Sequence, residues 1–268
     1  MKAIDSTVRL ATGREMPVMG LGTWQLERDT SEVVAEALRS GYRMIDTSGD
    51  YGTEPGVGEG LRGSGINRAD VFVVTKVEED EDAYQSTREG LDAMGIDYAD
   101  LMLVHRPPDD GAGEALWQGL RRARDEHLTR DIGVSNYTTE QIDALISDSG
   151  ETPAVNQIEW SPFGWDRGML DYANEHGIVI QAYSPLTRGE RLDHEVLTGI
   201  AETHGKTPAQ VVLRWQLQLG VVPLPKANAI DHLHENADIF DFELSDGEMA
   251  RIGGLNEHYS ALGSLPYV

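Results

Sequence analysis

The chain has 268 residues, of which 40% are hydrophobic and none is cysteine, and 46 acidic against 22 basic residues give it a formal net charge of −24. This composition excludes a disulfide framework, a thiolate nucleophile and a cysteine-based metal site, and it argues against nucleic acid or an anionic membrane as a partner. Because no apolar run approaches the ~20 residues of a membrane helix and the N-terminus lacks the apolar core of a signal peptide, we expect a soluble cytoplasmic protein.

Short apolar runs alternate with helical patterns along the chain. A hairpin is predicted over Thr7–Pro17, with its turn at Thr12–Gly13, and a first barrel strand near Met16–Leu21. The following candidate strands are Arg43–Thr47, Val71–Lys76, Asp100–His105, Asp131–Ser135, Ala154–Ile158, Val179–Tyr183 and Val221–Pro225. Helical spacing is found over Ser31–Arg39, Ala83–Met94, Glu114–Glu126, Thr139–Ser147 and Gln210–Leu219.

This order of elements indicates an α/β fold. Runs of Val, Ile and Leu without alternation are typical of parallel strands that are buried on both faces. Strand-then-helix units repeated eight times over roughly 250 residues predict a (β/α)₈ TIM barrel, with the hairpin closing the barrel floor. A doubly wound sheet would usually carry G-x-G-x-x-G after its first strand, and GLGTWQ at residues 20–25 breaks that pattern. With no linker or repeat, we predict one domain over residues 1–268.

Chemically useful side chains stand at the predicted C-terminal strand ends, where the active sites of such barrels lie. Asp46 and Tyr51 follow the second strand, Lys76 ends the third and His105 ends the fourth. A tyrosine titrates near pH 10 in water, and a nearby ammonium lowers that pKa. Asp46 would then be the counter-ion of Lys76, and His105 would hold the carbonyl oxygen that Tyr51 protonates. Any one of these residues alone is more often a turn or packing residue, but together they favour catalysis.

Further stretches along the chain form a combined pattern: GLGTW, IDTSGDYGTE, VTK, LVHRP, GVSNY, NQIE, AYSPL, LPKANAIDHLHEN and DFELSD. With this set the sequence resembles the aldo-keto reductase family, including its prokaryotic diketogluconate and aldehyde reductases, over nearly its whole length. The resemblance implies NAD(P)H-dependent reduction of aldehydes or ketones to alcohols, with Tyr51 as proton donor in a catalytic tetrad of Asp46, Tyr51, Lys76 and His105. It also implies NADP(H), and possibly NAD(H) as well, bound without a Rossmann domain.

The resemblance further implies which residues hold the cofactor. Side chains at residues 135, 136 and 157 would hold the carboxamide, and Tyr183 would stack on the nicotinamide ring. Ser184 to Leu186 would lie along the pyrophosphate, and Lys226 near the 2′-phosphate. The full expected set is Gly22, Thr23, Asp46, Ser135, Asn136, Gln157, Tyr183, Ser184, Leu186, Lys226, His232, Glu235 and Asn236, and no metal is expected. The alternative functions of these residues are helix capping, rim packing and solvated surface.

The sequence departs from the family where relatives line the substrate pocket with tryptophans. Glu78 stands two residues after the catalytic lysine and Arg106 directly after the catalytic histidine. Trp24 and Trp160 remain as candidate walls, so the expected pocket of Trp24, Glu78, Arg106 and Trp160 should favour small or polar carbonyl compounds. Arg106 could grip a substrate carboxylate, or it could form an ion pair with Glu78 at the rim, which we prefer slightly.

A second departure concerns cofactor choice. Relatives that prefer NADPH usually carry Ser or Thr after the lysine and Arg five residues later, whereas this chain has Ala227 and His232. We therefore expect NADH to be accepted as well as NADPH. The expected partner is a small carbonyl substrate, and the expected state is a monomer. Two other functions stay open: a cofactor-binding regulatory module with little turnover, and a metal-dependent hydrolase with Asp46 and His105 as ligands.

The basic residues are skewed as strongly as the charge. Only Lys2, Lys76, Lys206 and Lys226 are lysines, which leaves 18 of the 22 basic residues as arginines. A diffuse acidic surface that is poor in lysine resembles cytosolic proteins of salt-accumulating halophiles, where salt screens the self-repulsion. The scarcity of lysine also makes each lysine more informative.

Overall fold

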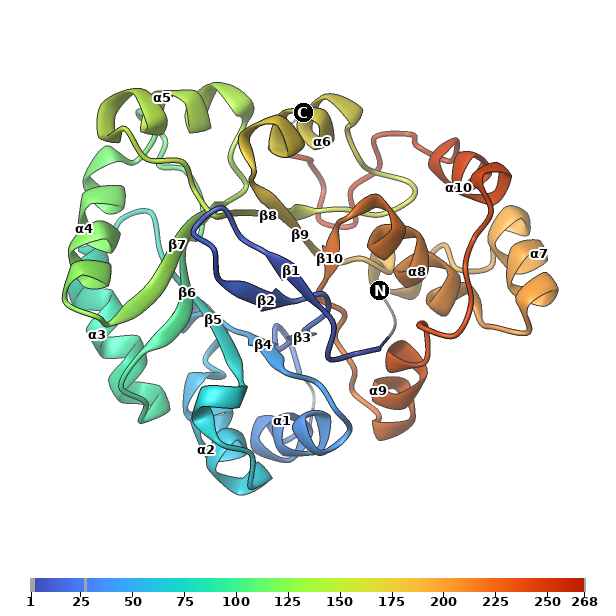
Figure 1. Ribbon diagram of the computed structural model, residues 1–268, viewed down its shortest axis with the longest axis horizontal. Coiled ribbons are helices and arrows are strands. Elements are labelled where there is room, and N and C mark those ends of the chain that lie inside the picture. Colours follow the sequence, from blue (N-terminus) through green and yellow to red (C-terminus); the bar gives the residue numbers. More distant parts are fainter. Residues whose placement is uncertain (1–2, 27, 268) are drawn as a thin grey trace.

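The computed structural model describes residues 3–26 and 28–267, and within them eight parallel strands form one sheet in chain order (Figure 1). The strands are β3 (Leu21–Gly22), β4 (Met44–Asp46), β5 (Phe72–Val77), β6 (Ala99–Val104), β7 (Thr129–Ser135), β8 (Val155–Glu159), β9 (Val179–Tyr183) and β10 (Val222–Pro223). The sheet closes between its first and last strands, because the N–H groups of Gly20 and Gly22 donate to the carbonyls of Pro223 and Pro225, each at 3.1 Å. The predicted barrel is confirmed.

Helices surround the sheet on its outer side (Figure 1). They are α1 (Thr30–Arg39), α2 (Glu54–Ser64), α3 (Ala83–Met94), α4 (Glu114–Asp125), α5 (Thr139–Ser149), α6 (Arg167–His176), α7 (Glu195–His204), α8 (Pro208–Leu219), α9 (Ile230–Ala237) and α10 (Asp246–Gly253), with short 3₁₀ turns η1 (Gly49–Tyr51), η2 (Arg68–Asp70) and η3 (Thr187–Gly189). Their starts follow local signals, since Thr138, Thr207 and Ser245 each form a capping box with the residue three positions later.

The N-terminal hairpin covers one end of the barrel. Its strands β1 (Thr7–Arg9) and β2 (Glu15–Pro17) pair antiparallel, and in Figure 1 they cross the middle of the ring of strands. Leu10 and Met16 of this hairpin are buried in the same inner cluster as Met44, Phe72 and Val179, near the starts of their strands. The hairpin therefore closes the N-terminal end and leaves the carboxyl ends of the strands for the site.

The predicted first barrel strand, Met16–Leu21, is wrong in its bounds. Met16 belongs to β2 of the hairpin, and the barrel strand is β3 at Leu21–Gly22. An apolar run that plugs a barrel floor has the same composition as a buried barrel strand, because Met16 and Leu21 are both fully buried. The sequence pattern therefore cannot separate the two.

The charge predicts that thermal stability rises with salt. The Debye length falls from about 10 Å at 0.1 M to about 3 Å at 1 M salt, so repulsion among acidic groups should weaken strongly in molar KCl. We expect a higher Tm in molar KCl than in dilute buffer, measured by circular dichroism, with isosmotic sucrose as the uncharged control. A higher Tm in the dilute buffer would refute the halophilic interpretation.

Among the described residues, no helix has the length and apolar character needed to cross a membrane.

Candidate active site

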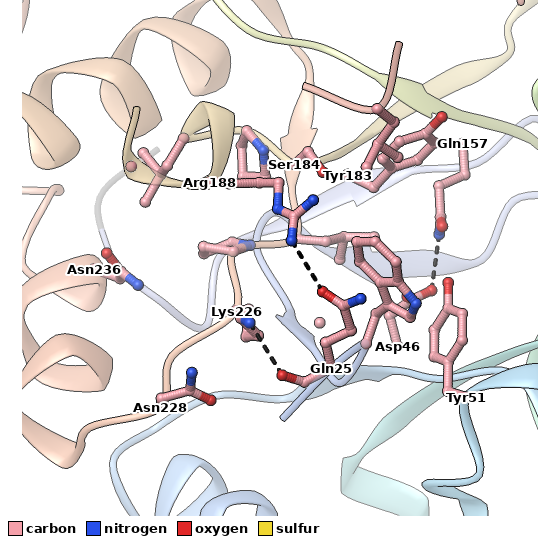
Figure 2. Close-up of a pocket in the computed structure, with 18 of the residues that line it drawn as sticks. Gln25, Asp46, Tyr51, Gln157, Tyr183, Ser184, Arg188, Lys226, Asn228 and Asn236 are labelled. Atoms are coloured by element: carbon pink, nitrogen blue, oxygen red, sulfur yellow. Dashed lines mark hydrogen bonds between the residues drawn. The ribbon is translucent and has the colours of Figure 1, made fainter. Parts of the chain in front are cut away.

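A cavity of about 760 Å³ opens at the carboxyl ends of the strands (Figure 2). It brings together most of the residues that the sequence singled out. Those in its lining are Gly22, Trp24, Asp46, Tyr51, His105, Arg106, Ser135, Asn136, Gln157, Tyr183, Ser184, Leu186, Lys226, His232, Glu235 and Asn236. Residues far apart in the chain thus converge on one site, because parallel strands end at the same edge of the barrel.

The floor of the site is a buried ion pair. Lys76 Nζ donates to both carboxylate oxygens of Asp46 at 3.0 Å and to the carbonyl of Thr47 at 2.8 Å. Gln157 Nε2 donates to Asp46 Oδ1 at 2.8 Å, which adds a further bond to the carboxylate. Burial alone would lower the pKa of Lys76, but Asp46 and Tyr51 outweigh it and hold this pKa above its ordinary value. The ion pair that the sequence predicts between Lys76 and Asp46 is present, and it favours the charged form of Lys76.

Tyr51 lies beside this cation on the turn η1. Lys76 Nζ is 4.9 Å from the centre of the Tyr51 ring, and the ring meets that of His105 edge-on at 5.7 Å between centroids. Burial raises the pKa of Tyr51, Lys76 lowers it, and the net pKa lies above the ordinary tyrosine value. Lys76 acts in the predicted direction, but in this structure burial is the larger effect.

His105 is backed by a carboxylate. Its Nδ1 lies 2.6 Å from Glu78 Oε1, which also accepts a hydrogen bond of 3.1 Å from Ser48 Oγ. Arg106 Nη1 donates to Glu78 Oε2 at 3.2 Å, and Nη2 of the same side chain lies 3.9 Å from Asp50 Oδ2. The expected rim ion pair between Glu78 and Arg106 is present, and it places Glu78 against the histidine ring.

The acidic groups near His105 could in principle hold a metal ion. Potential ligand atoms of Asp50, Glu78 and His105 lie within 4.8 Å of one another. However, the Arg106 guanidinium already contacts both carboxylates, and Asp46 is paired with Lys76. The metal-hydrolase alternative, with Asp46 and His105 as ligands, would have to break that buried pair.

Amide and hydroxyl groups form the wall beyond His105. Ser135 Oγ donates to the carbonyl of Gln157 at 2.7 Å, and Asn136 Nδ2 donates to the carbonyl of His105 at 3.0 Å. The Tyr183 hydroxyl donates to Asn136 Oδ1 at 2.7 Å, which fixes the tyrosine ring at the cavity edge. Asn136 has a φ of 66°, a left-handed conformation that asparagine tolerates better than most residues. This wall is ordered by its own hydrogen bonds.

At the other end of the cavity, Gln25 connects two cationic side chains, as Figure 2 shows. Lys226 Nζ donates to the Gln25 carbonyl at 3.0 Å, and Arg188 Nη2 donates to Gln25 Oε1 at 3.3 Å. Neither Gln25 nor Arg188 was among the site residues predicted from the sequence. The available signal was an arginine two residues after the matched stretch AYSPL, in a chain otherwise dominated by acidic residues.

Some expected site residues lie elsewhere. Trp160 was expected as a substrate wall, but its side chain is fully buried between Trp165 and Tyr267, with ring centroids 5.7 and 6.5 Å away, so this prediction is wrong. Thr23 is also fully buried, and its hydroxyl donates to the Asp46 carbonyl at 2.9 Å. It supports the strand end that carries Asp46. Glu78 lies behind His105, so its expected place in the substrate pocket is corrected to a supporting position.

The C-terminal segment contributes a part of the rim that the sequence analysis did not predict. Glu159, at the end of β8, accepts hydrogen bonds from Ser260 Oγ at 2.6 Å and from the Ala261 N–H at 2.7 Å. The Tyr267 hydroxyl donates to the Glu159 carbonyl. These contacts fix the segment so that Leu262, which is 44% exposed, reaches the cavity lining.

Comparison with known proteins gives consistent matches. The sequence model of the Aldo/keto reductase family matches residues 18–257. Glyoxal reductase from Bacillus subtilis (strain 168) is 41% identical over 261 residues, 95% of this chain and 94% of that protein. The crystal structure of an aldo/keto reductase from Brucella melitensis has a TM-score of 0.87 at 39% identity and covers 93% of this chain and 98% of its own. An aldo-keto reductase from Bombyx mori in complex with NADP has a TM-score of 0.90 at 32% identity, covering 97% and 95%.

Proposed function

The chain belongs to the aldo/keto reductase family and is an NAD(P)-dependent oxidoreductase, and on this premise we propose that it reduces small aldehydes or ketones with Tyr51 as the proton donor. The observation that carries the proposal is the convergence of Tyr51, the buried Lys76–Asp46 pair and His105 on one cavity. A phenol beside a fixed ammonium and an imidazole is suited to giving a proton to a carbonyl oxygen.

The cavity suits a nicotinamide dinucleotide. Ser135, Asn136 and Gln157 offer hydroxyl and amide groups of the kind that match a carboxamide, and Tyr183 offers an aromatic face. Lys226 offers a cation for a phosphate group. The similarity to the Bombyx mori protein in complex with NADP supports NADP(H) as the cofactor. When bound, the reduced nicotinamide supplies a hydride to the carbonyl carbon.

The protein's own groups divide the remaining work. Tyr51 transfers its hydroxyl proton to the carbonyl oxygen, so that hydride and proton together give the alcohol. The phenolate that remains is stabilised by Lys76, whose charge Asp46 maintains. His105, whose ring is 5.7 Å from that of Tyr51, lies where it can orient the same oxygen. The hydrogen bonds from Ser135 to the Gln157 carbonyl and from Gln157 to Asp46 keep these groups in place.

Small, polar carbonyl compounds are the proposed substrates. Arg106 and Asp50 line the cavity near Tyr51 and make this part of the rim charged. The similarity to a protein named glyoxal reductase supports the same size class. The test is consumption of NADPH, followed by its absorbance in molar KCl, over a panel that begins with glyoxal and extends to bulky aromatic ketones. Retained NADPH binding with no consumption for any compound would overturn the proposal and favour a cofactor-binding module.

We predict that NADPH is preferred only modestly over NADH. Ala227, where relatives carry a hydroxyl, is buried and offers no side-chain donor, and Lys226 is exposed and easily screened by salt. The variant His232→Arg should increase the NADPH preference about tenfold, on the order of one charge-assisted hydrogen bond. The matched control is His234→Arg, because His234 lies on the same helix but contacts Ser40 outside the cavity.

The measurement is kcat/KM for both cofactors, together with cofactor Kd from protein fluorescence, at low and high KCl. The ratio of the two kcat/KM values should fall towards one as salt rises, because only NADPH carries the extra phosphate charge. Undetectable use of NADH at every salt concentration would show that another group holds the 2′-phosphate strictly.

A further inference from the structure

Glu78 contacts His105 at the ring nitrogen that faces away from the cavity. His105 is 6% exposed and lines the cavity, whereas the Glu78 side chain, 17% exposed, lies behind it with Oε1 2.6 Å from Nδ1. The Nδ1 position is therefore occupied by the protein itself, and Nε2 is the nitrogen left for a ligand. Which nitrogen carries the proton decides what His105 offers to that ligand.

The other partners of Glu78 indicate where this proton lies. Ser48 Oγ donates to Oε1 at 3.1 Å, and Arg106 Nη1 donates to Oε2 at 3.2 Å. Burial raises the pKa of Glu78, but the hydrogen bond from His105, the one from Ser48 and the charge of Arg106 outweigh it, and the net pKa lies below its ordinary value. An ionised carboxylate only accepts hydrogen bonds, so in the 2.6 Å contact Nδ1 has to be the donor.

We propose that Glu78 is a positioning residue that holds the proton of neutral His105 on Nδ1, so that Nε2 faces the cavity as a hydrogen-bond acceptor and becomes a donor only when the ring is an imidazolium. This inference deepens the proposed carbonyl reduction and rests on it for its catalytic consequence. The placement of the proton itself depends only on the contacts of Glu78 with His105, Ser48 and Arg106.

The consequence is a pH dependence of carbonyl reduction. A carbonyl oxygen only accepts hydrogen bonds, so it can bind Nε2 of the imidazolium but not Nε2 of the neutral ring. Reduction should therefore weaken as pH rises through the His105 pKa, because neutral Nε2 no longer donates to the carbonyl oxygen.

The groups around His105 set where this change occurs. Burial, Lys76 and Arg106 lower the pKa of His105, Glu78 raises it, and the net pKa lies below the ordinary histidine value. Tyr51 meets the ring edge-on, and Asp50 lies 3.9 Å from Arg106. The loss of reduction with rising pH should thus begin below the ordinary histidine pKa of about 6.5.

The same geometry selects a substrate class. A carbonyl compound with a hydroxyl on the neighbouring carbon can donate that hydroxyl to neutral Nε2, while Tyr51 donates to the carbonyl oxygen. Such a compound should keep its kcat/KM at neutral and alkaline pH, where a simple aldehyde loses it. Glycolaldehyde and propionaldehyde are the matched pair, because they differ chiefly in the group on the carbon next to the carbonyl, a hydroxyl in the first and a methyl in the second.

The decisive variant is Glu78→Gln. Arg106 needs an acceptor at the Oε2 position, so the amide oxygen should take that position and the amide nitrogen should face His105. An amide N–H donates to Nδ1, which moves the histidine proton to Nε2. The matched control is Glu79→Gln, which removes the same charge from a residue that also contacts Arg106, at 3.6 Å.

The first readout is the tautomer, read from two-bond ¹⁵N–¹H correlation spectra of the apoprotein above the His105 pKa, with His105 assigned by its loss in His105→Gln. We expect Nδ1–H in the wild type and in Glu79→Gln, and Nε2–H in Glu78→Gln. An Nε2–H tautomer in the wild type would overturn the inference, and it would leave carbonyl reduction by Tyr51 unaffected.

The second readout is kcat/KM for propionaldehyde against pH. For the wild type and Glu79→Gln we expect kcat/KM to fall about tenfold per pH unit above the His105 pKa. For Glu78→Gln we expect this decline to be absent. If Glu78→Gln changed the tautomer but showed the same decline of kcat/KM with pH, the tautomer would not control the pH dependence of reduction. Absence of turnover in the wild type would instead overturn the proposed function, since the spectra are recorded without substrate.

Discussion

Tyr51→Phe should abolish carbonyl reduction while cofactor binding survives. The substitution removes only the hydroxyl, so the ring can keep its edge contact with His105 at 5.7 Å and its place over Lys76 at 4.9 Å. General acid catalysis by a positioned side chain contributes roughly 100- to 10,000-fold, and we expect kcat to fall by the upper part of that range. His105, as an imidazolium, is the nearest substitute.

The measurements are kcat for glyoxal and Kd for NADPH, the latter from fluorescence. Loss of kcat with unchanged Kd separates the loss of the acid from damage to the cofactor site. Tyr172→Phe is the control, because it removes a tyrosine hydroxyl that donates to Asp143 at 2.7 Å on the outer surface. A kcat for Tyr51→Phe within a few-fold of the wild type would show that the proton comes from elsewhere.

The strand-end residues could be predicted because barrel topology brings them together. Parallel strands that run in chain order place Asp46, Lys76, His105 and Gln157 at one edge, whatever the helices between them do. The hydrogen bonds from Lys76 and Gln157 to the Asp46 carboxylate follow from that placement. Local sequence was sufficient here because each residue lies at or near the end of a recognisable apolar run.

Side-chain direction beyond a strand end could not be predicted in the same way. Trp160 follows directly after β8 and was expected to face substrate, yet it packs against Trp165 and Tyr267. Tyr267, whose hydroxyl donates to the Glu159 carbonyl, lies 108 residues after Glu159 in the chain. A contact of that range leaves no trace in a local pattern, and the same holds for Arg188 and Gln25.

Helix α2 was not predicted from the sequence, because its glycines allow close packing against α3 but are typical of non-helical segments. Its sequence EPGVGEGLRGS is rich in glycine, which normally argues against a helix. A Cβ on Gly58 would lie 1.8 Å from the carbonyl oxygen of Met94, so the backbone of α2 approaches the end of α3 too closely for any side chain. Close packing accounts for a residue that helix propensity disfavours.

Lys76→Met should remove both activity and stability. The Lys76 side chain is fully buried and that of Asp46 is 5% exposed, so the variant leaves a buried carboxylate whose remaining described side-chain donor is Gln157. Removing one partner of a buried pair typically costs about 3–5 kcal/mol, because the other charge stays in a poorly solvated place. Reduction should also fall strongly, since no ammonium remains to stabilise the phenolate of Tyr51.

The sign of the pH dependence follows from Lys76. Its pKa is raised in the folded protein, so the stability that it contributes is fully present below the ordinary lysine pKa of about 10.4 and is lost as pH rises through the higher folded value. The difference in unfolding free energy between wild type and Lys76→Met should therefore persist through neutral pH and narrow only in strong alkali. Urea unfolding in molar KCl at several pH values measures it.

The double variant Asp46→Asn with Lys76→Met separates the two roles of the pair. Without the carboxylate no uncompensated charge is buried, and replacing a buried ion pair by neutral groups is often close to neutral in stability. We therefore expect the double variant to regain most of the unfolding free energy that Lys76→Met loses, while reduction of glyoxal stays lost because the ammonium beside Tyr51 is still missing. If the double variant instead recovered turnover along with stability, Lys76 would serve the fold alone, and the tuning of Tyr51 by its charge would have to be abandoned.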